Sequence, residues 1–145
     1  MLGDLLTKRT IQYSNKDNMD WKSIIKLAAE PLVINGSIAP SYVDAMITIS
    51  EKDGPYFNIG PEIVLAHARP EDGSNTIALS LLKTNQEVDL IDEKHPAKLW
   101  FVLASKDNNS HLEVIKELMQ LLTNKVKVDA LLSAKSVSNI KKIIG

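Results

Sequence analysis

The feature that most constrains the fold is an unbroken apolar run, Leu99–Ala104 (LWFVLA). Such a run is typical of a β-strand that is buried on both faces. The segment Thr76–Leu82 predicts a second strand of this kind, because large apolar residues on one face alternate with small, nearly apolar residues on the other. The polar segment between them, Lys83–Lys98, is expected to be a long connection. Strands that are buried on both faces need helices on both sides of their sheet.

Helical patterns precede these strands. Asp20 is a good N-cap for an amphipathic helix. Pro31 lies inside this pattern and is expected to kink the helix, or to split it at Glu30. Pro40 suits the first position of another helix, which ends before Gly54. Helices are therefore expected on the N-terminal side of the strand region.

Helical patterns also follow the strands. Ser105–Ser110 is a polar loop, and Ser110 is a plausible N-cap for a helix that begins at His111. The apolar face of this helix is expected to consist of Leu112, Ile115, Leu118, Met119 and Leu122. A short helix over Val126–Leu132 and a last helix that ends at Ile144 complete the pattern. The sequence thus predicts an α/β fold in which a single mixed sheet lies between helices on both faces.

Length and composition narrow the functional classes. The chain has 145 residues, which fits a single domain over residues 1–145. Its formal net charge is −1, with acidic and basic residues interspersed, which argues against a surface for nucleic acid or membranes. The absence of cysteine excludes disulfides, thiolate metal sites and a cysteine nucleophile on this chain. The N-terminus lacks a signal-peptide pattern and no apolar run approaches membrane-spanning length, so a cytoplasmic protein without membrane insertion is expected.

A histidine stands at the end of an apolar run in the segment 55–73 (PYFNIGPEIVLAHARPEDG). His67 has an alanine on each side and is followed by Arg69, whose guanidinium group suits phosphate. His111 lies beyond the end of Leu99–Ala104. Functional groups of α/β sheets gather at the carboxyl ends of strands, so both histidines can meet if the two strands run the same way. The sequence therefore predicts a phosphate-sized pocket, to which a helix N-terminus adds amide donors.

The chemistry that suits such a pocket is phosphorylation of a histidine. A neutral imidazole nitrogen of His67 can attack a phosphoryl group, while Arg69, His111 and helix amides offset the charge on its oxygens. Imidazole supplies the neutral form near neutral pH without strong tuning. Arg69 can instead form a surface ion pair with Glu71 or Asp72, which would have little energetic weight.

Simpler interpretations of the histidines stay open at this point. A histidine at a strand end or in a first helical turn is often structural or exposed, and His95 is expected to be solvated in its charged loop. A metal-dependent hydrolase that uses His67, His95 and His111 is disfavoured, because no ligand pair has the close spacing of zinc sites. The aromatic residue Tyr42 is expected to belong to the core.

The segment 54–73 (GPYFNIGPEIVLAHARPEDG) closely resembles the active-site segment of the IIA components of the bacterial phosphoenolpyruvate-dependent sugar phosphotransferase system. It is most similar to the mannitol/fructose class, or type-2 IIA domain, and within it to the ascorbate branch. The His-x-Arg-Pro-Glu motif and the preceding Gly-Pro-Tyr carry the resemblance. It extends to Asp20-Trp21 with the following helix, to Tyr42–Met46 and to Lys106–His111, and so covers most of the chain.

This resemblance implies a fold, a role for each site residue and a set of partners. The family's fold is a mixed five-stranded sheet between helices. By this resemblance His67 accepts a phosphoryl group on Nε2, His111 assists without being the acceptor, and Arg69 lies near the site. The donor would be the phosphocarrier HPr and the acceptor a cysteine of a cognate IIB protein, with a membrane IIC partner for uptake. No metal or organic cofactor is expected.

The resemblance also bears on the transported compound, and two residues depart from the family pattern. The ascorbate branch points to uptake of L-ascorbate or a related sugar or pentitol. The alternative is a regulatory module of the same fold, whose phosphohistidine signals to a regulator and does not feed a transporter. Ala66 stands where many relatives have proline, and Glu62 where many have glycine. These departures concern the fine geometry of the site and the subgroup, not the chemistry.

Overall fold

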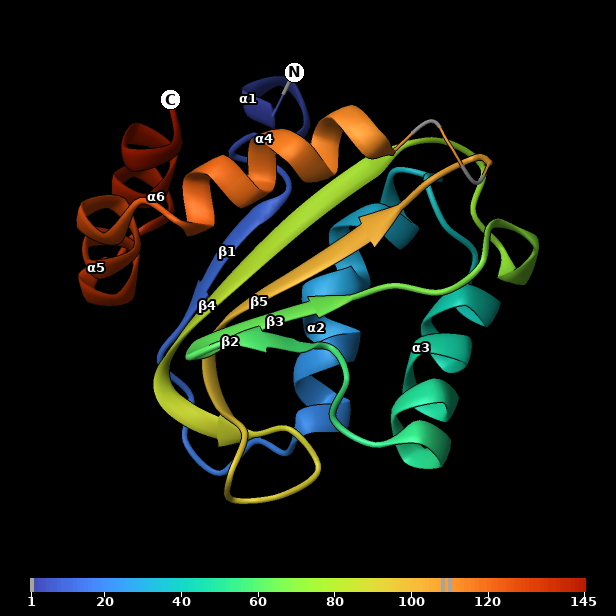
Figure 1. Cartoon of the computed structure of the whole chain (residues 1–145), viewed down its shortest axis with the longest axis horizontal. Coiled ribbons are helices and arrows are strands. Elements are labelled where there is room, and N and C mark those ends of the chain that lie inside the picture. The colour runs from blue at the N-terminus through green and yellow to red at the C-terminus, as the bar shows by residue number, and fades with distance from the viewer. Residues whose placement is uncertain (1, 108, 110) are drawn as a thin grey trace.

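The computed structural model of the chain describes residues 2–107, 109 and 111–145. Its centre is a five-stranded sheet with the strand order β1-β4-β5-β3-β2 (Figure 1). The strands are β1 (Ile11–Ser14), β2 (Asn58–Gly60), β3 (Glu62–Ala66), β4 (Ala78–Asp89) and β5 (Pro96–Ala104). β1 runs parallel to β4 and β3 parallel to β5, whereas the β4–β5 and β2–β3 pairs are antiparallel. The predicted mixed sheet is therefore confirmed.

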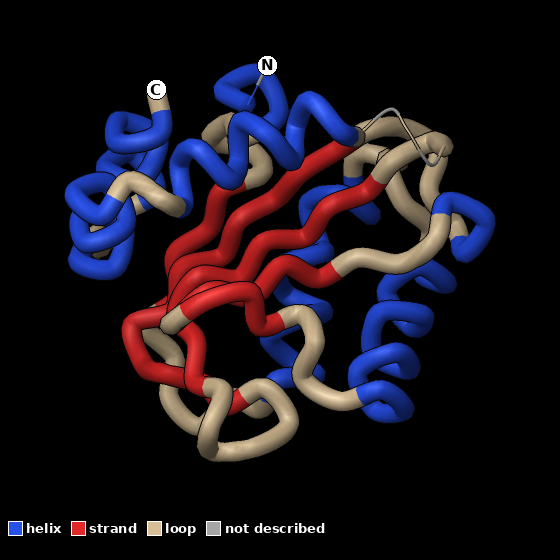
Figure 2. The backbone as a smooth tube through the Cα atoms, viewed as in Figure 1, coloured by secondary structure: helices blue, strands red, loops and turns tan. Residues whose placement is uncertain are grey.

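Helices cover both faces of the sheet, as predicted (Figures 1 and 2). One face carries α2 (Trp21–Ile34) and α3 (Pro40–Asp53). The other carries α1 (Leu2–Leu5), α4 (Leu112–Leu122), α5 (Lys125–Ser133) and α6 (Val137–Ile144). A short 3₁₀-helix, η1 (Pro70–Asp72), lies in the loop after β3. Within the described part of the chain, no helix is both long and apolar enough to cross a membrane.

The central strands contribute side chains to two separate cores. In β4, Leu79 and Leu81 pack in the core beneath α4 and α6, whereas Ala78 and Leu82 pack in the core beneath α2 and α3. The residues of β5 alternate in the same way, and Trp100 is 1% exposed in the second of these cores. This alternation confirms that both strands are buried on two faces.

Of the two outcomes expected at Pro31, a kink or a split at Glu30, the split is wrong, because α2 continues through Pro31 to Ile34. Proline has no N–H, so the carbonyl of Leu27 loses its donor within the helix. The side-chain amide of Gln12 on β1 replaces that donor, with Nε2 2.7 Å from the Leu27 carbonyl oxygen. A hydrogen bond from a distant strand thus satisfies the group that the proline leaves free.

The expected long connection over Lys83–Lys98 is also wrong. β4 extends to Asp89, β5 begins at Pro96, and only residues 90–95 connect them. The pairing is irregular, with a register shift between Lys83 and Val88. Lys83 is 2% exposed, and its ammonium group lies 5.4 Å from the centre of the Tyr13 ring. The polar residues therefore belong to a bulged strand. The bulge interrupts the alternation of buried and exposed residues, so the sequence pattern does not reveal the strand.

The helix after the polar loop begins at Leu112, one residue later than expected, and His111 takes the N-cap position. The expected cap Ser110 lies outside the described residues. Most of the predicted apolar face is confirmed, because Leu118 is buried and Ile115, Met119 and Leu122 pack against the core, together with the buried residues Val114 and Leu121. Leu112 is the exception and is 59% exposed. The start of α4 is thus more open to solvent than the predicted pattern implies.

Candidate functional site

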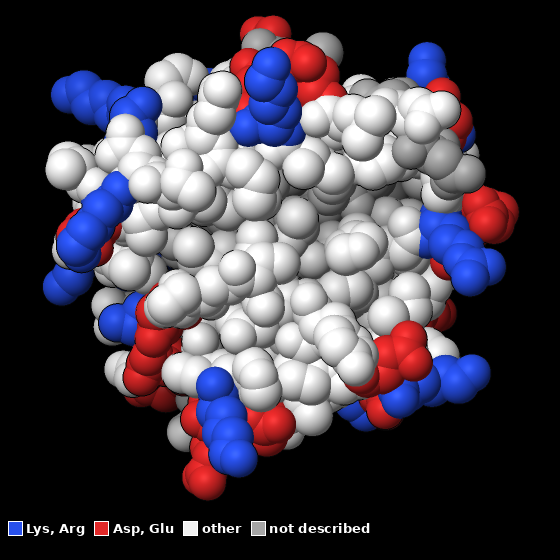
Figure 3. All heavy atoms as spheres, viewed as in Figure 1, with Lys and Arg blue, Asp and Glu red and all other residues white. Residues whose placement is uncertain are grey.

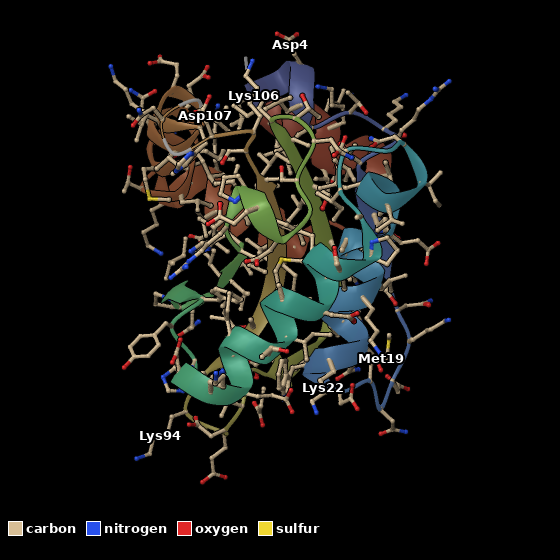
Figure 4. The ribbon with its side chains drawn as sticks, turned by 90° about the vertical axis from the view of Figure 1, so that its right-hand side faces the viewer. Asp4, Met19, Lys22, Lys94, Lys106 and Asp107 are labelled. Atoms are coloured by element: carbon tan, nitrogen blue, oxygen red, sulfur yellow. The ribbon has the colours of Figure 1, made fainter. Side chains whose placement is uncertain are left out.

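A pocket of about 220 Å³ lies where the carboxyl ends of β3 and β5 meet α4. Its lining residues include all three predicted site residues: His67, Arg69 and His111. The parallel pairing of β3 with β5 brings them together, because His67 directly follows β3 and the loop to His111 follows β5. Figure 4 shows Lys106 and Asp107 of that loop at one end of the molecule, far from Lys94 at the other end.

A larger groove of about 770 Å³ lies beside β1, α1 and the C-terminal end of α2. Lys8, Arg9 and Glu30 contribute to it, but none of the predicted site residues does. Size alone would favour this groove, whereas the nucleophilic and cationic groups favour the smaller pocket. The chemistry of the lining residues decides for the smaller one.

His67 is exposed at the end of β3, and its ring is oriented on two sides. Its Nδ1 lies 3.0 Å from the carbonyl oxygen of Leu65. A carbonyl only accepts hydrogen bonds, so this contact places the proton on Nδ1 and leaves the lone pair on Nε2. The ring of the buried residue Phe57 packs against the imidazole, with ring centres 4.9 Å apart. The arrangement thus presents Nε2 as a nucleophile.

Arg69 is exposed at the N-cap of η1. The alternative of an ion pair with Glu71 or Asp72 is not seen: among the residues that the structure describes, the Arg69 guanidinium has no carboxylate in salt-bridge contact. The Asp72 carboxylate instead accepts the backbone N–H of Arg69 at 3.1 Å. This contact fixes the backbone and leaves the guanidinium available to an anion in the pocket.

His111 is partly buried at the start of α4. Its Nδ1 is buried and has no hydrogen-bond partner within the described part of the chain. A proton on this nitrogen would be a buried donor without an acceptor, so the geometry favours the tautomer with the proton on Nε2. His111 can then donate a hydrogen bond, and the N-terminal end of the α4 dipole adds to the positive potential.

Tyr42 on α3 is the site residue that sequence reasoning missed. It is buried as predicted, but its hydroxyl group reaches the pocket wall. The hydroxyl oxygen accepts the N–H of Ala68 at 3.0 Å, and the hydroxyl donates to the carbonyl of Leu103 at 2.8 Å. Burial raises the pKa of Tyr42, so the group stays protonated. Sequence reasoning could expect a polar partner for a buried tyrosine hydroxyl, but not which backbone groups that partner would be.

His95 does not join the other two histidines. It lies in the connection before β5, where its Nδ1 is 2.7 Å from Oδ1 of Asp92. The length of β5, roughly 25 Å at ~3.3 Å per residue, separates it from the loop that leads to His111. No cluster of three or more potential metal ligands occurs in residues 2–107, 109 and 111–145. The hypothesis of a metal site that uses all three histidines is therefore wrong.

The two departures from the family pattern lie in β3. Ala66 pairs in register with Val102 of β5 and is 1% exposed. Glu62 has a φ of 68°, in the left-handed region that favours glycine, so a glycine would fit this position without strain. Glu62 stands at the opposite end of β3 from His67, so it lies outside the pocket.

Comparison with known proteins identifies the family of the chain. The family model described as phosphoenolpyruvate-dependent sugar phosphotransferase system, EIIA 2, matches residues 4–145. A mannitol-specific cryptic phosphotransferase enzyme IIA component of Escherichia coli is 30% identical over 125 residues, which cover 86% of this chain and 85% of the relative. An ascorbate-specific EIIA component of Salmonella typhi is 28% identical over 126 residues, which cover 86% and 82%.

A solved structure gives the same result for the fold. The solution structure of the mannitol-specific cryptic enzyme IIA CmtB from Escherichia coli matches with a TM-score of 0.91 at 29% identity. The match covers 99% of this chain and 97% of that one. The chain therefore belongs to the EIIA 2 family of the phosphoenolpyruvate-dependent sugar phosphotransferase system, and it is a phosphotransferase IIA component.

Proposed function

We propose that His67 accepts a phosphoryl group from HPr and passes it to a cysteine of a cognate IIB protein. The observation that carries this proposal is the pocket at the ends of β3 and β5, which His67, Arg69 and His111 line together while the Leu65 carbonyl holds Nδ1 of His67. The partner IIC protein would then move the sugar across the membrane. Ascorbate or a related sugar or pentitol is the proposed cargo, because the His-x-Arg-Pro-Glu segment resembles the ascorbate branch.

In the first transfer, the lone pair on Nε2 of His67 attacks the phosphorus atom of the phosphorylated donor. A nitrogen–phosphorus bond forms at Nε2, and the bond from phosphorus to the donor breaks, with its electron pair returning to the donor. The product ring carries a proton on Nδ1, and the Leu65 carbonyl stabilises the positive charge that develops there. Arg69 and the Nε2–H of His111 offset the charge on the phosphoryl oxygens.

In the second transfer, the thiolate of the IIB cysteine attacks the same phosphorus atom. The bond to Nε2 breaks, and its electron pair restores the neutral imidazole with the proton still on Nδ1. Each step moves one phosphoryl group between nucleophiles, so the proposal needs neither a metal nor an organic cofactor. The exposed position of His67 suits a group that must meet two proteins in turn.

The test is to incubate the protein with phosphoenolpyruvate, enzyme I and HPr, and to locate the acid-labile phosphate by mass spectrometry. The wild-type protein should carry it on residue 67, His67→Ala should not be labelled, and His111→Ala should be labelled more slowly. His95→Ala is the matched control and should be labelled like the wild type, since His95 lies at the far end of β5.

Two results would contradict the proposal. Phosphate on another residue would show that the pocket is not the acceptor site. If no cognate IIB protein takes the phosphate from His67, the regulatory alternative would replace the role of transporter subunit.

A further inference from the structure

We propose that Tyr42 is a positioning residue for phosphoryl transfer, because its hydroxyl group ties the His67–Arg69 segment to the end of β5. This inference rests on the proposed transfer through His67. It concerns the geometry of the pocket and assigns Tyr42 no part in the chemistry itself.

The hydroxyl of Tyr42 joins two chain segments that build the pocket. Ala68 stands between His67 and Arg69, and its N–H donates to the hydroxyl oxygen at 3.0 Å. Leu103 lies at the end of β5, just before the loop that leads to His111, and its carbonyl accepts the hydroxyl proton at 2.8 Å. One side chain thus fixes the nucleophile's segment relative to the segment that carries the second histidine.

Neighbouring contacts show that the start of α3 holds the whole loop after β3. The hydroxyl of Ser41 donates to the carbonyl of Asp72 at 2.8 Å, and the N–H of Ala39 donates to the carbonyl of Gly73 at 2.8 Å. A Cβ atom at Gly73 would lie 2.6 Å from the Ser41 hydroxyl oxygen, so the loop approaches α3 closely. Tyr42 is the member of this set that also reaches β5.

Core packing alone does not account for the hydroxyl. Tyr42 is 1% exposed, and a phenylalanine would fill the same apolar space without the cost of burying a polar group. The hydroxyl instead uses its donor and its acceptor capacity on backbone groups of the pocket. Without it, the Ala68 N–H would lose its partner and the segment on either side would be free to shift.

A shift of this kind should slow the chemical step and leave docking of the partner unchanged. A misplacement of the reacting atoms by about 1 Å can reduce a rate by roughly a hundredfold. For Tyr42→Phe we therefore expect kcat for transfer from phosphorylated HPr to fall by about tenfold to a hundredfold, with KM for HPr unaltered.

Tyr13→Phe is the matched control. Tyr13 lies on the edge strand β1, outside the lining of the pocket, and its ring contacts Lys83. This variant loses the same hydroxyl group and should transfer phosphate at the wild-type rate. The amide of Ala68 should exchange its hydrogen faster in Tyr42→Phe and not in Tyr13→Phe. A general loss of stability would instead speed up exchange at many amides.

A backbone ester between His67 and residue 68 gives an independent test. Lactic acid in place of Ala68 removes the N–H and keeps the side chain, so it should lower kcat to the same extent as Tyr42→Phe. Combining the two changes should add no further loss. Wild-type rates in Tyr42→Phe, or in the ester variant, would overturn the inference. Absence of label on His67 in the wild type would instead overturn the proposed function.

Discussion

At the scale of single residues, Glu62 combines two unfavourable features within β3. Its backbone has a φ of 68°, and its carboxyl group lies against Glu87. Burial, a hydrogen bond with Glu87 and the charge of Glu87 raise the pKa of Glu62 from 4.5 to about 7, although Lys98 opposes this effect. Glu62 therefore holds a proton at pH values where an ordinary glutamate has lost it.

This pKa difference predicts a pH dependence of stability. Between pH 4.5 and about 7 the folded state binds more protons than the unfolded state, so the contribution of Glu62 falls as the pH rises through this window. The side chain in Glu62→Gln cannot ionise, so this substitution should remove the slope. The free energy of unfolding of the variant, relative to that of the wild type, should therefore increase towards pH 7. Urea unfolding at several pH values from 4.5 to 8 measures the difference. Parallel curves for the two proteins would contradict the prediction.

The site residues differ in how visible they are in the sequence. His67 directly follows an apolar run and Arg69 stands two residues later, whereas His111 follows the polar loop after the second run, so their placement near strand ends could be predicted. The role of Tyr42 could not, because its partners belong to residues 68 and 103, far away in the chain. Periodicity shows that a side chain is buried, and does not show which backbone groups its hydroxyl meets.

At the scale of elements, the continuity of α2 depends on one hydrogen bond from β1. Gln12→Ala leaves the Leu27 carbonyl without the donor that Pro31 also cannot supply. We expect a loss of about 1 to 2 kcal/mol in the free energy of unfolding. In a Pro31→Ala background the helix regains its own N–H, so the same substitution should cost much less. A double-mutant cycle by urea unfolding measures this coupling, and additive effects would show that Gln12 does not replace the missing donor.

The errors at this scale have a common cause. Pro31 and the segment Lys83–Lys98 both break a local pattern, and local rules therefore predict a break in the element. In the folded chain, tertiary contacts compensate. The Gln12 side chain donates to the Leu27 carbonyl, and the ammonium group of Lys83 lies over the Tyr13 ring. Elements without such compensation, such as α3 from Pro40, begin and end where the sequence predicts.

At the scale of the whole molecule, two-sided burial of the strands made the layered arrangement predictable, whereas the strand order was not. The order β1-β4-β5-β3-β2 depends on connections that cross the sheet, and hydrophobic patterns do not record which strands become neighbours. The site depends on one of these choices. Had β3 and β5 been antiparallel, His67 and the loop to His111 would lie at opposite ends of the sheet.

The surface around the pocket predicts how the partner proteins dock. On the face shown in Figure 3, charged side chains lie around the rim and other residues form the middle. Leu112 directly follows His111 and is 59% exposed, whereas Val126 is 79% exposed on α5, beyond the far end of α4 (Figure 1). We therefore expect a donor that brings phosphorus to His67 to contact Leu112, and apolar contact of this kind favours association.

Leu112→Ser should therefore raise KM for phosphorylated HPr several-fold with little change in kcat, because it weakens docking and leaves the reacting groups in place. Val126→Ser removes an even more exposed apolar side chain far from the pocket and should behave like the wild type. Steady-state transfer kinetics at varied HPr concentration separate the two parameters. Equal KM values for both variants would mean that the donor approaches His67 without covering the start of α4. This pattern of KM is the opposite of the one expected for Tyr42→Phe, so the two experiments distinguish docking from positioning within the same pocket.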